Sequence, residues 1–283
     1  MTPLLHKLFL FSACLCSAAQ EPPTLPNAHD GDRKASDAAA IAGFARIDGE
    51  AAYAAFMAWR NAPENHNLKW QKATEKYRAK LIAGGMKPAV AARTISIISS
   101  RDEGVYYDPL YANPNPKFQT SPNKLLIEAV NHRKPGRALD VGMGQGRNAI
   151  YLARLGWDVT GFDTSRTGLE QAQKTARAAG LQIRTVLASD EEFDFGTENW
   201  DLIAIIYPIE KRSIYRVRQA LKPGGIVVVE CSHKEGANAP FEYDTNELLK
   251  IFEGFRIIKY EDTIDEHEWV RKQLRLVRLI AEK

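Results

Sequence analysis

The sequence has few of the residues that build metal centres and disulfide frameworks. Only three cysteines occur in 283 residues, and Cys14 and Cys16 both fall in the first 19 positions. If that segment is removed, Cys231 stands alone, and one thiol forms neither an internal disulfide nor a zinc site. The six histidines show no metal-ligand spacing. We therefore expect no metal.

Strong charge of one sign and long apolar runs are also missing. The formal net charge is only +3 and no basic run exceeds a few residues. Binding of nucleic acid outside an active site needs clustered Lys and Arg, so nucleic acid is not expected as a partner. The N-terminal apolar run, Leu8 to Cys16, is shorter than the roughly 20 residues that span a bilayer, so we expect no transmembrane span.

The first 19 residues have the three-part pattern of a secretory signal. His6 and Lys7 form a weak basic start before the apolar run, and Ser17-Ala18-Ala19 is a small-residue cleavage site. The pattern predicts a signal peptide over residues 1–19 and export to the periplasm, the exterior or a membrane tether. A disordered or helical tail on a cytoplasmic protein is the alternative. Residues 20–35 contain three prolines and little apolar content, which predicts a disordered linker.

Residues 36–119 predict a helical cap. Trp70, Tyr77 and Leu81 recur at helical spacing within residues 67–83, and Pro88 opens a second helix that we expect to continue through Ile98. These apolar stripes are more typical of core contacts than of a cofactor site.

A polar-aromatic segment at the end of this cap connects it to a helix that we expect to be opened by Ser121-Pro122. The tyrosines of this segment have two possible roles. Either they line a substrate pocket, because their apolar rings carry a polar tip, or they only seal the cap onto the next domain. The tyrosines are Tyr106, Tyr107 and Tyr111.

A glycine-rich turn decides which ligand class the rest of the chain suits. A buried strand is expected to stop at Asp140, followed by Gly142, Gly144 and Gly146 and a helix from about Arg147. Strand, turn and helix N-terminus form a nucleotide-sized binding edge in an open α/β sheet. A dinucleotide fingerprint would need glycine or alanine at position 147, and a P-loop would need Gly-Lys-Ser/Thr. The remaining pattern, an acid followed by three alternating glycines, suits a ligand with a cationic group near Asp140 and a carboxylate at the helix N-terminus.

Further strands and acids follow in regular order. Strands are expected over residues 157–163, 182–188, 201–207 and 226–230, with helices over 168–179 and 210–221. Asp163 ends the second strand and Asp190 follows the third, while Lys222-Pro-Gly-Gly225 predicts a turn before the fifth. Residues 252–264 and 269–281 are expected to form an antiparallel pair.

Taken together, these motifs resemble the class I S-adenosylmethionine-dependent methyltransferases. The resemblance covers residues 120–283, and the Gly146-Arg147-Asn148 helix start is similar to the small-molecule branch that includes tellurite-resistance and thiopurine-type enzymes. It implies an α/β, Rossmann-like, seven-stranded and mostly parallel sheet with a C-terminal antiparallel strand pair, preceded by the helical cap. It also implies S-adenosyl-L-methionine as cofactor, with Asp163 on the ribose hydroxyls and Asp190 on the adenine amino group. The full set of expected cofactor residues is Asp140, Gly142, Gly144, Gly146, Asp163, Thr164, Asp190 and Glu191.

Methyl transfer from a sulfonium is an in-line displacement that the protein assists mainly by alignment and exclusion of water, and proximity alone contributes roughly 7–11 kcal/mol. His233 is the best-placed candidate general base, although an exposed loop histidine is the alternative. Tyr207 and Glu230 are weaker candidates. Tyr207-Pro208 lacks the leading Asn or Asp typical of enzymes that methylate the amino group of adenine or glutamine, which argues against that class of acceptor.

Two other functions stay open. One is a cofactor-binding protein without transferase activity. The other is transfer of a different group, such as an aminopropyl group, for which the sequence shows no clustered acids near Tyr207. The acceptor and the oligomeric state are not determined by the sequence.

Overall fold

The computed structural model describes residues 47–207, 209, 211–234 and 242–283. The predicted signal peptide and most of the chain before the first described helix, including the linker, lie outside this part. No described helix is both long and apolar enough to cross a membrane. The chain divides into two compact units, residues 1–98 and residues 99–283.

The described part of the first unit is helical. It comprises α3 (Gly49–Arg60), α4 (Trp70–Ala83) and the beginning of α5 (Pro88–Ala112). Asp48 caps α3, because its Oδ1 accepts the Ala51 N–H at 3.1 Å. Phe56 is fully buried and meets Tyr77 edge to face, with ring centroids 5.1 Å apart. This small core explains the helical spacing of the aromatic residues.

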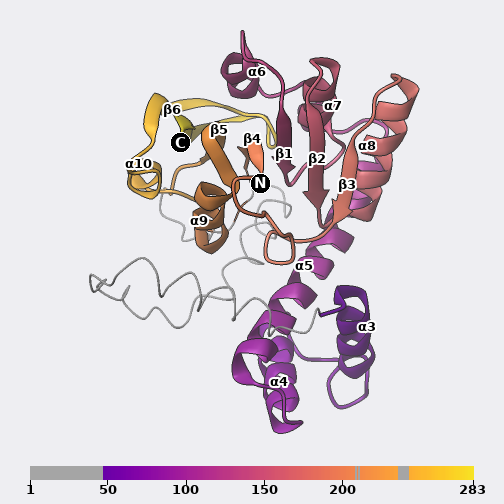
Figure 1. Cartoon of the computed structure of the whole chain (residues 1–283). Coiled ribbons are helices and arrows are strands. Elements are labelled where there is room, and N and C mark those ends of the chain that lie inside the picture. The colour runs from indigo at the N-terminus through magenta and orange to yellow at the C-terminus, as the bar shows by residue number, and fades with distance from the viewer. Residues whose placement is uncertain (1–46, 208, 210, 235–241) are drawn as a thin grey trace. The chain divides into compact units, whose positions relative to one another are not determined.

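The second unit is built on a seven-stranded sheet in the order β3–β2–β1–β4–β5–β7–β6 (Figure 1). The first five strands run parallel, and β7 runs antiparallel to both β5 and β6. The predicted fold is thereby confirmed. The strands are β1 (Arg137–Val141), β2 (Asp158–Asp163), β3 (Arg184–Leu187), β4 (Trp200–Ile206), β5 (Leu221–Ser232), β6 (Arg256–His267) and β7 (Lys272–Glu282).

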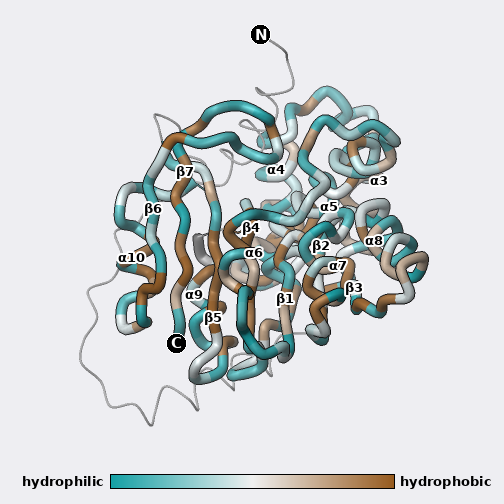
Figure 2. The backbone as a smooth tube through the Cα atoms, turned by 90° about the horizontal axis from the view of Figure 1, so that it is seen from above, coloured by the Kyte–Doolittle hydropathy of each residue, from teal (hydrophilic) through white to brown (hydrophobic). Residues whose placement is uncertain are grey.

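Helices cover both faces of this sheet. The side chains of β5 point alternately to the two faces and show which helices pack on each. Ile226 and Val228 pack with α6 (Lys124–Val130), α7 (Arg147–Arg154) and α8 (Arg166–Ala178). Val227 and Val229 pack on the other face with α9 (Lys211–Ala220) and α10 (Glu247–Ile251). Successive side chains of a strand point to opposite faces, so a strand buried on both faces is apolar throughout. Figure 2 shows this as brown segments along β5 and β7.

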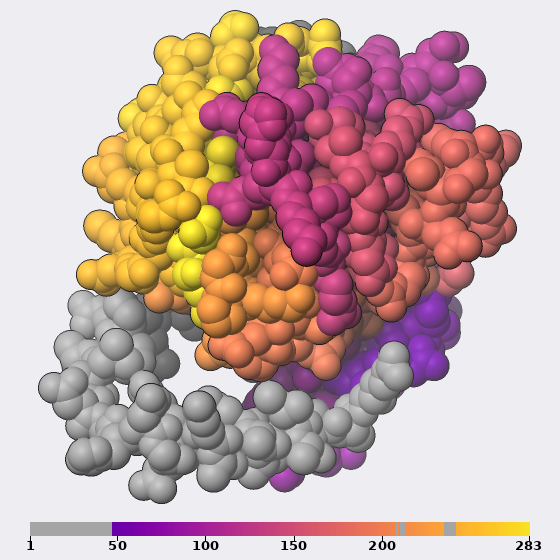
Figure 3. Space-filling view, turned by 45° about the horizontal axis from the view of Figure 1, so that its top comes forward, coloured from indigo at the N-terminus to yellow at the C-terminus, as the bar shows by residue number. Residues whose placement is uncertain are grey.

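The C-terminal hairpin lies against α6 and the residues that follow it. In Figure 3 the yellow C-terminal residues adjoin the magenta segment that contains α6. Lys259 pairs with Glu128 at 2.6 Å, and Arg133 pairs with Glu282 at 3.1 Å. The two antiparallel strands are therefore fixed to α6 and the residues after it through side chains, and to β5 through the hydrogen bonds of β7.

Two local predictions were wrong. Helix α5 does not end at Ile98 but continues to Ala112 with Pro109 inside it, so Tyr106 to Tyr111 are helical. Proline in a helix leaves the carbonyl four residues earlier without its donor, and Val105 lies on the exposed side, where its side chain is 56% accessible and water is within reach. The second error concerns Lys222 to Gly225, which lie inside β5 as a register irregularity opposite Trp200 to Leu202.

Candidate active site

The glycine turn leaves bare backbone at the edge of the sheet where the parallel strands end. Gly142, Gly144 and Gly146 have φ angles of 63°, 51° and 78°, in the left-handed region that favours glycine. A Cβ on Gly146 would lie 2.8 Å from the Cβ of Ala172, and one on Gly144 would lie 2.5 Å from the Tyr111 hydroxyl. The turn therefore needs glycine both for its conformation and for the close approach of α8 and Tyr111.

Two buried carboxylates stand beside this turn at the ends of adjacent strands. Asp140 is 1% exposed, and its Oδ2 accepts the Ala149 N–H of α7 at 3.0 Å. Asp163 is 8% exposed and accepts the N–H groups of Gly144 and Ser165, each at 2.8 Å. The structure thus brings together the predicted residues of the first two strands.

Burial makes both carboxylates reluctant to ionise. Burial raises the pKa of Asp140 to about 7, against the opposing effect of Arg147. Burial likewise raises the pKa of Asp163 to about 6, although the backbone N–H groups of Ser165 and Gly144 oppose it. A cationic group or ribose hydroxyls at this edge would favour the ionised forms. The residues present therefore fit an S-adenosyl cofactor.

The second half of α5 contacts the loops around these carboxylates. The Asp108 carboxylate accepts the Ser165 hydroxyl at 2.6 Å and the Thr167 N–H at 3.0 Å. A Cβ on Gly104 would lie 2.1 Å from the carbonyl oxygen of Thr164. Helix α5 therefore touches the backbone of the loop that follows Asp163. Sequence reasoning missed this contact because it carried the helix only through Ile98.

The loop after β3 carries the predicted adenine-side acids. Asp190 and Glu191 are half-buried there, and Arg216 donates to the backbone carbonyl of Asp190. The neighbouring Glu192 holds this loop to α5, since Arg101 donates two hydrogen bonds to its carboxylate, at 2.9 and 3.0 Å. The loop lies at the same edge as Asp163, and the contact of Asp190 with adenine stays a prediction.

Tyr207 comes directly after β4 and is strained. Its φ of 82° is unusual for a bulky residue, and such outliers concentrate at functional sites. Its hydroxyl donates to Glu230 Oε1 at 2.7 Å and accepts the Glu268 N–H at 3.0 Å. Burial, followed by the Glu230 charge, raises the pKa of Tyr207 well above its ordinary value. The phenol therefore stays protonated and suits a positioning role better than that of a base.

Asn123 joins the two glutamates beside Tyr207. Its Nδ2 lies 3.0 Å from Glu230 Oε1 and 3.1 Å from Glu268 Oε2. Sequence reasoning found no clustered acids near Tyr207, and this was wrong, because Glu268 is brought in from 145 positions beyond Asn123. Nothing local in the sequence marks that contact.

Each of these glutamates also has a guanidinium partner. Arg147 lies 2.6 Å from Glu268, and Arg278 lies 2.6 Å from Glu230. Asn148 accepts the backbone N–H of Asn123 at 2.9 Å. Arg147 and Asn148 therefore connect the glycine turn to the start of α6 and to the hairpin between β6 and β7.

His233 belongs to a different environment. Its side chain is only 5% exposed, so the alternative of an exposed loop histidine was wrong. Its Nε2 lies 3.0 Å from Thr245 Oγ1 and 4.0 Å from Asp262. Alternation along β5 puts His233 on the α9 and α10 face, opposite to Glu230. Its part as a general base stays a prediction, and the structure does not bring it to Tyr207.

The predicted tyrosines join two further aromatic side chains. Tyr107 and Tyr111 are one helical turn apart, with ring centroids separated by 6.2 Å. Tyr111 contacts Phe118, and both Tyr107 and Tyr111 contact Trp269. Tyr106 packs edge to face on Tyr107 at 5.3 Å. Trp269 was not predicted, because it reaches this site only through the hairpin between β6 and β7.

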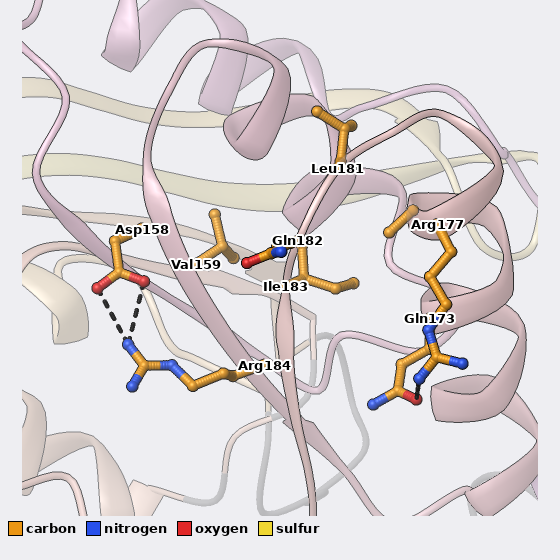
Figure 4. Close-up of a pocket in the computed structure, with 9 residues that line it drawn as sticks. Asp158, Val159, Gln173, Arg177, Leu181, Gln182, Ile183 and Arg184 are labelled. Carbon is orange, nitrogen blue, oxygen red and sulfur yellow. Dashed lines mark hydrogen bonds and ion pairs between the residues drawn. The ribbon is translucent and has the colours of Figure 1, made fainter.

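A hollow also lies at the opposite end of the strands. Figure 4 shows it between α8 and the beginnings of β2 and β3, with Arg184 hydrogen-bonded to both carboxylate oxygens of Asp158 at 3.0 Å. Asp158 is the first residue of β2, whereas Asp163 is its last. This hollow is therefore separate from the glycine turn.

Comparison with known proteins agrees with the geometry. Residues 138–225 match the family model described as "Methyltransferase domain". The "Probable S-adenosyl-L-methionine-dependent methyltransferase TehB" of Haemophilus influenzae is 26% identical over 153 residues, which are 50% of this chain and 53% of that protein. The chain thus spans about half the length of the curated relatives it matches.

Solved structures share the fold. The crystal structure of TehB from Haemophilus influenzae has a TM-score of 0.51 and 21% identity, covering 64% of this chain and 67% of that one. The [4+2]-cyclase SpnF has a TM-score of 0.53 and 18% identity, covering 65% of this chain and 96% of that one.

The fold, the turn and the family match agree on one class: residues 138–225 match a methyltransferase domain, and they lie within a seven-stranded Rossmann-like sheet. Within that class, TehB of Haemophilus influenzae is a relative in both sequence and fold.

Proposed function

We propose that this protein transfers a methyl group from S-adenosyl-L-methionine to a small-molecule acceptor. The observation that carries the proposal is the pair of buried aspartates, Asp140 and Asp163, beside the positive-φ glycine turn. Asp163 would hold the ribose hydroxyls and Asp140 the ammonium group, while the N-terminus of α7 would attract the carboxylate. Asp190 would receive the adenine amino group, with Thr164 and Glu191 beside it.

The chain's own residues contribute alignment and a dry site. When bound, S-adenosyl-L-methionine would supply an activated methyl group for in-line displacement by the acceptor's nucleophilic atom. Tyr111 covers Gly144, and Tyr207 is held between Glu230 and Glu268. Fixed side chains of this kind supply the positioning that such a displacement needs.

A fold alone does not decide between transfer and other chemistry, as the cyclase SpnF illustrates. Transfer of an aminopropyl group gains some support from Glu230 and Glu268, which would suit a polyamine. Both carboxylates are already paired with guanidinium groups, however, at 2.6 Å each. Their charge is therefore largely compensated, which favours methyl transfer over the polyamine reaction.

Calorimetric titration with S-adenosylmethionine and S-adenosylhomocysteine tests the cofactor. We expect Asp163→Ala to weaken binding by roughly 1.5–3 kcal/mol, since it removes charge-assisted hydrogen bonds. Asp194→Ala is the matched control, because Asp194 is an exposed aspartate. No binding of either ligand below millimolar concentration would refute the proposed function, and transfer of label from the donor to small thiols, phenols or amines would establish it.

A further inference from the structure

The turn that joins β6 to β7 lies beside the glycine turn, although more than 120 residues separate the two. We define the β6–β7 tip as residues Glu268–Val270. Gln119 donates its backbone N–H to the carbonyl of Glu268 at 2.9 Å, and Arg147 pairs with the Glu268 carboxylate at 2.6 Å. The tip is therefore fixed to the first residue of α7 and to the segment that precedes α6.

Trp269 on this tip completes a group of four aromatic rings. Its ring stacks on Phe118 at 4.3 Å with an interplanar angle of 11°, and it meets Tyr107 and Tyr111 edge to face, each at 5.9 Å. We call Tyr107, Tyr111, Phe118 and Trp269 the aromatic wall. All except Tyr111 are only partly buried, so part of the surface of these three residues stays accessible.

The position of the wall ties it to the transfer site. Tyr111 lies against Gly144, where an added Cβ would be 2.5 Å from the hydroxyl. At the other end, the backbone N–H of Glu268 donates to the Tyr207 hydroxyl at the end of β4. The aromatic wall therefore contacts the cofactor turn, and the tip that carries Trp269 also contacts the strained tyrosine.

The charges at this edge disfavour a small anionic acceptor. Arg147 and Arg278 are two guanidinium groups at this edge, and each is paired with a buried or half-buried carboxylate. Asp140 and Asp163 add further acid. Flat apolar ring surface next to compensated charge suits an uncharged ring better than an oxyanion.

We propose that the acceptor is a planar, uncharged aromatic molecule that stacks on the aromatic wall, and that Glu268 is a positioning residue that holds Trp269 in it. The inference rests on the proposed function and narrows its substrate class. Trp269 acts by direct contact with the acceptor. Glu268 acts through Trp269, by its bonds to Arg147, Asn123 and Tyr207.

The test uses the full chain loaded with S-adenosylhomocysteine and pairs of probes that share a functional group and a carbon skeleton, one member with an aromatic ring and the other with a saturated ring. The pairs are benzyl thiol with cyclohexylmethanethiol, phenol with cyclohexanol, and benzylamine with cyclohexylmethylamine. We expect the aromatic member of at least one uncharged pair to bind three-fold tighter or more by calorimetry. A lack of aromatic preference in both uncharged pairs would overturn the inference, as would a preference confined to the cationic amine.

Variants separate recognition from folding. Trp269→Ala should lower the affinity for the preferred aromatic probe at least five-fold and leave the affinity for its saturated partner unchanged. Trp269→Phe should retain most of the affinity for the aromatic probe. Glu268→Gln should lower the affinity for the same probe about three-fold. Glu266→Gln is its matched control, because Glu266 on β6 pairs with Arg271 at 2.8 Å and is 44% exposed.

S-adenosylhomocysteine affinity and melting temperature are measured for every variant. If Glu268→Gln weakens probe binding while the S-adenosylhomocysteine affinity and melting temperature stay unchanged, a positioning role for Glu268 is supported. An equal loss of affinity for both members of a probe pair contradicts that role. Failure of the unmodified protein to bind S-adenosylhomocysteine at all would refute the proposed function instead, so the two failures are distinguishable.

Discussion

Asp140 and Asp163 show how a buried residue that suits a ligand can lower the stability of the ligand-free protein. Both have a folded-state pKa above the ordinary aspartate value of 3.8, about 7 and about 6 respectively, and burial is the main cause. Between pH 4 and pH 7 these two carboxyl groups therefore hold more protons in the folded protein than in the unfolded chain. Their contribution to the free energy of unfolding of the ligand-free protein consequently falls as pH rises through this range.

We predict that Asp140→Asn stabilises the ligand-free protein at pH 8 by about 0.5–2 kcal/mol. Asparagine can still accept the Ala149 N–H without a buried charge. At pH 4.5 the gain should vanish, because the native Asp140 is then protonated in the folded state. Urea denaturation at the two pH values measures the effect, and calorimetry should show weaker S-adenosylmethionine binding.

Asp194→Asn, at an exposed position, is the control for that experiment. A stability gain of equal size at both pH values would contradict the assigned role of burial. An unchanged affinity would contradict the assigned contact of Asp140 with the ligand.

Residues in one local motif were predictable and residues joined across the chain were not. Asp140, the three glycines and Asp163 follow from strand ends and turn conformation, which depend on neighbouring residues. Asn123 and Glu268 meet only because the hairpin after β5 folds back onto α7. Tyr207 was identified from its place after β4, but its bonds to Glu230 and Glu268 depend on three separate strands.

At the scale of elements, the succession of strands and helices in the sheet followed the sequence pattern closely, and the end of α5 did not. Buried parallel strands are continuous apolar runs bounded by glycine and acid, which single segments reveal. The end of α5 was misplaced because Pro109 and three tyrosines are typical of an irregular connection. Contacts made by Gly104 and Asp108 on the loop after β2 extend the helix where local propensity would end it.

Gly104→Ala tests the docking of α5. In an isolated helix alanine would be more favourable than glycine by roughly 0.5–1 kcal/mol. Here the new Cβ would lie 2.1 Å from the Thr164 carbonyl oxygen, so the helix must shift. We expect a net loss of about 1–3 kcal/mol in unfolding free energy and weaker S-adenosylhomocysteine binding.

The matched control for that substitution is Gly84→Ala at the end of α4, where the nearest contacts would be an ordinary 3.4 Å. Urea denaturation and calorimetry measure both variants. A stabilised Gly104→Ala protein with unchanged affinity would show that α5 does not constrain the cofactor loop.

At the scale of the whole molecule, all residues assigned to the cofactor and the acceptor lie in the second unit, residues 99–283. The first unit has a core of its own around Phe56 and Tyr77. The family match, over residues 138–225, also falls within the second unit. Cofactor binding should therefore stabilise the second unit and leave the stability of the first unit unchanged.

Hydrogen exchange measured by mass spectrometry on the full chain checks this distribution. At a ligand concentration 100 times the dissociation constant, binding stabilises the native state by about 2.7 kcal/mol. We expect S-adenosylhomocysteine to slow exchange by up to about 100-fold in peptides covering residues 104–112, 142–149 and 163–168. Peptides covering α3 and α4 should be unaffected, because neither helix carries a predicted ligand contact. Asp163→Ala at the same ligand concentration should lose most of the protection, and equal protection across residues 49–83 would show that the first unit takes part in binding.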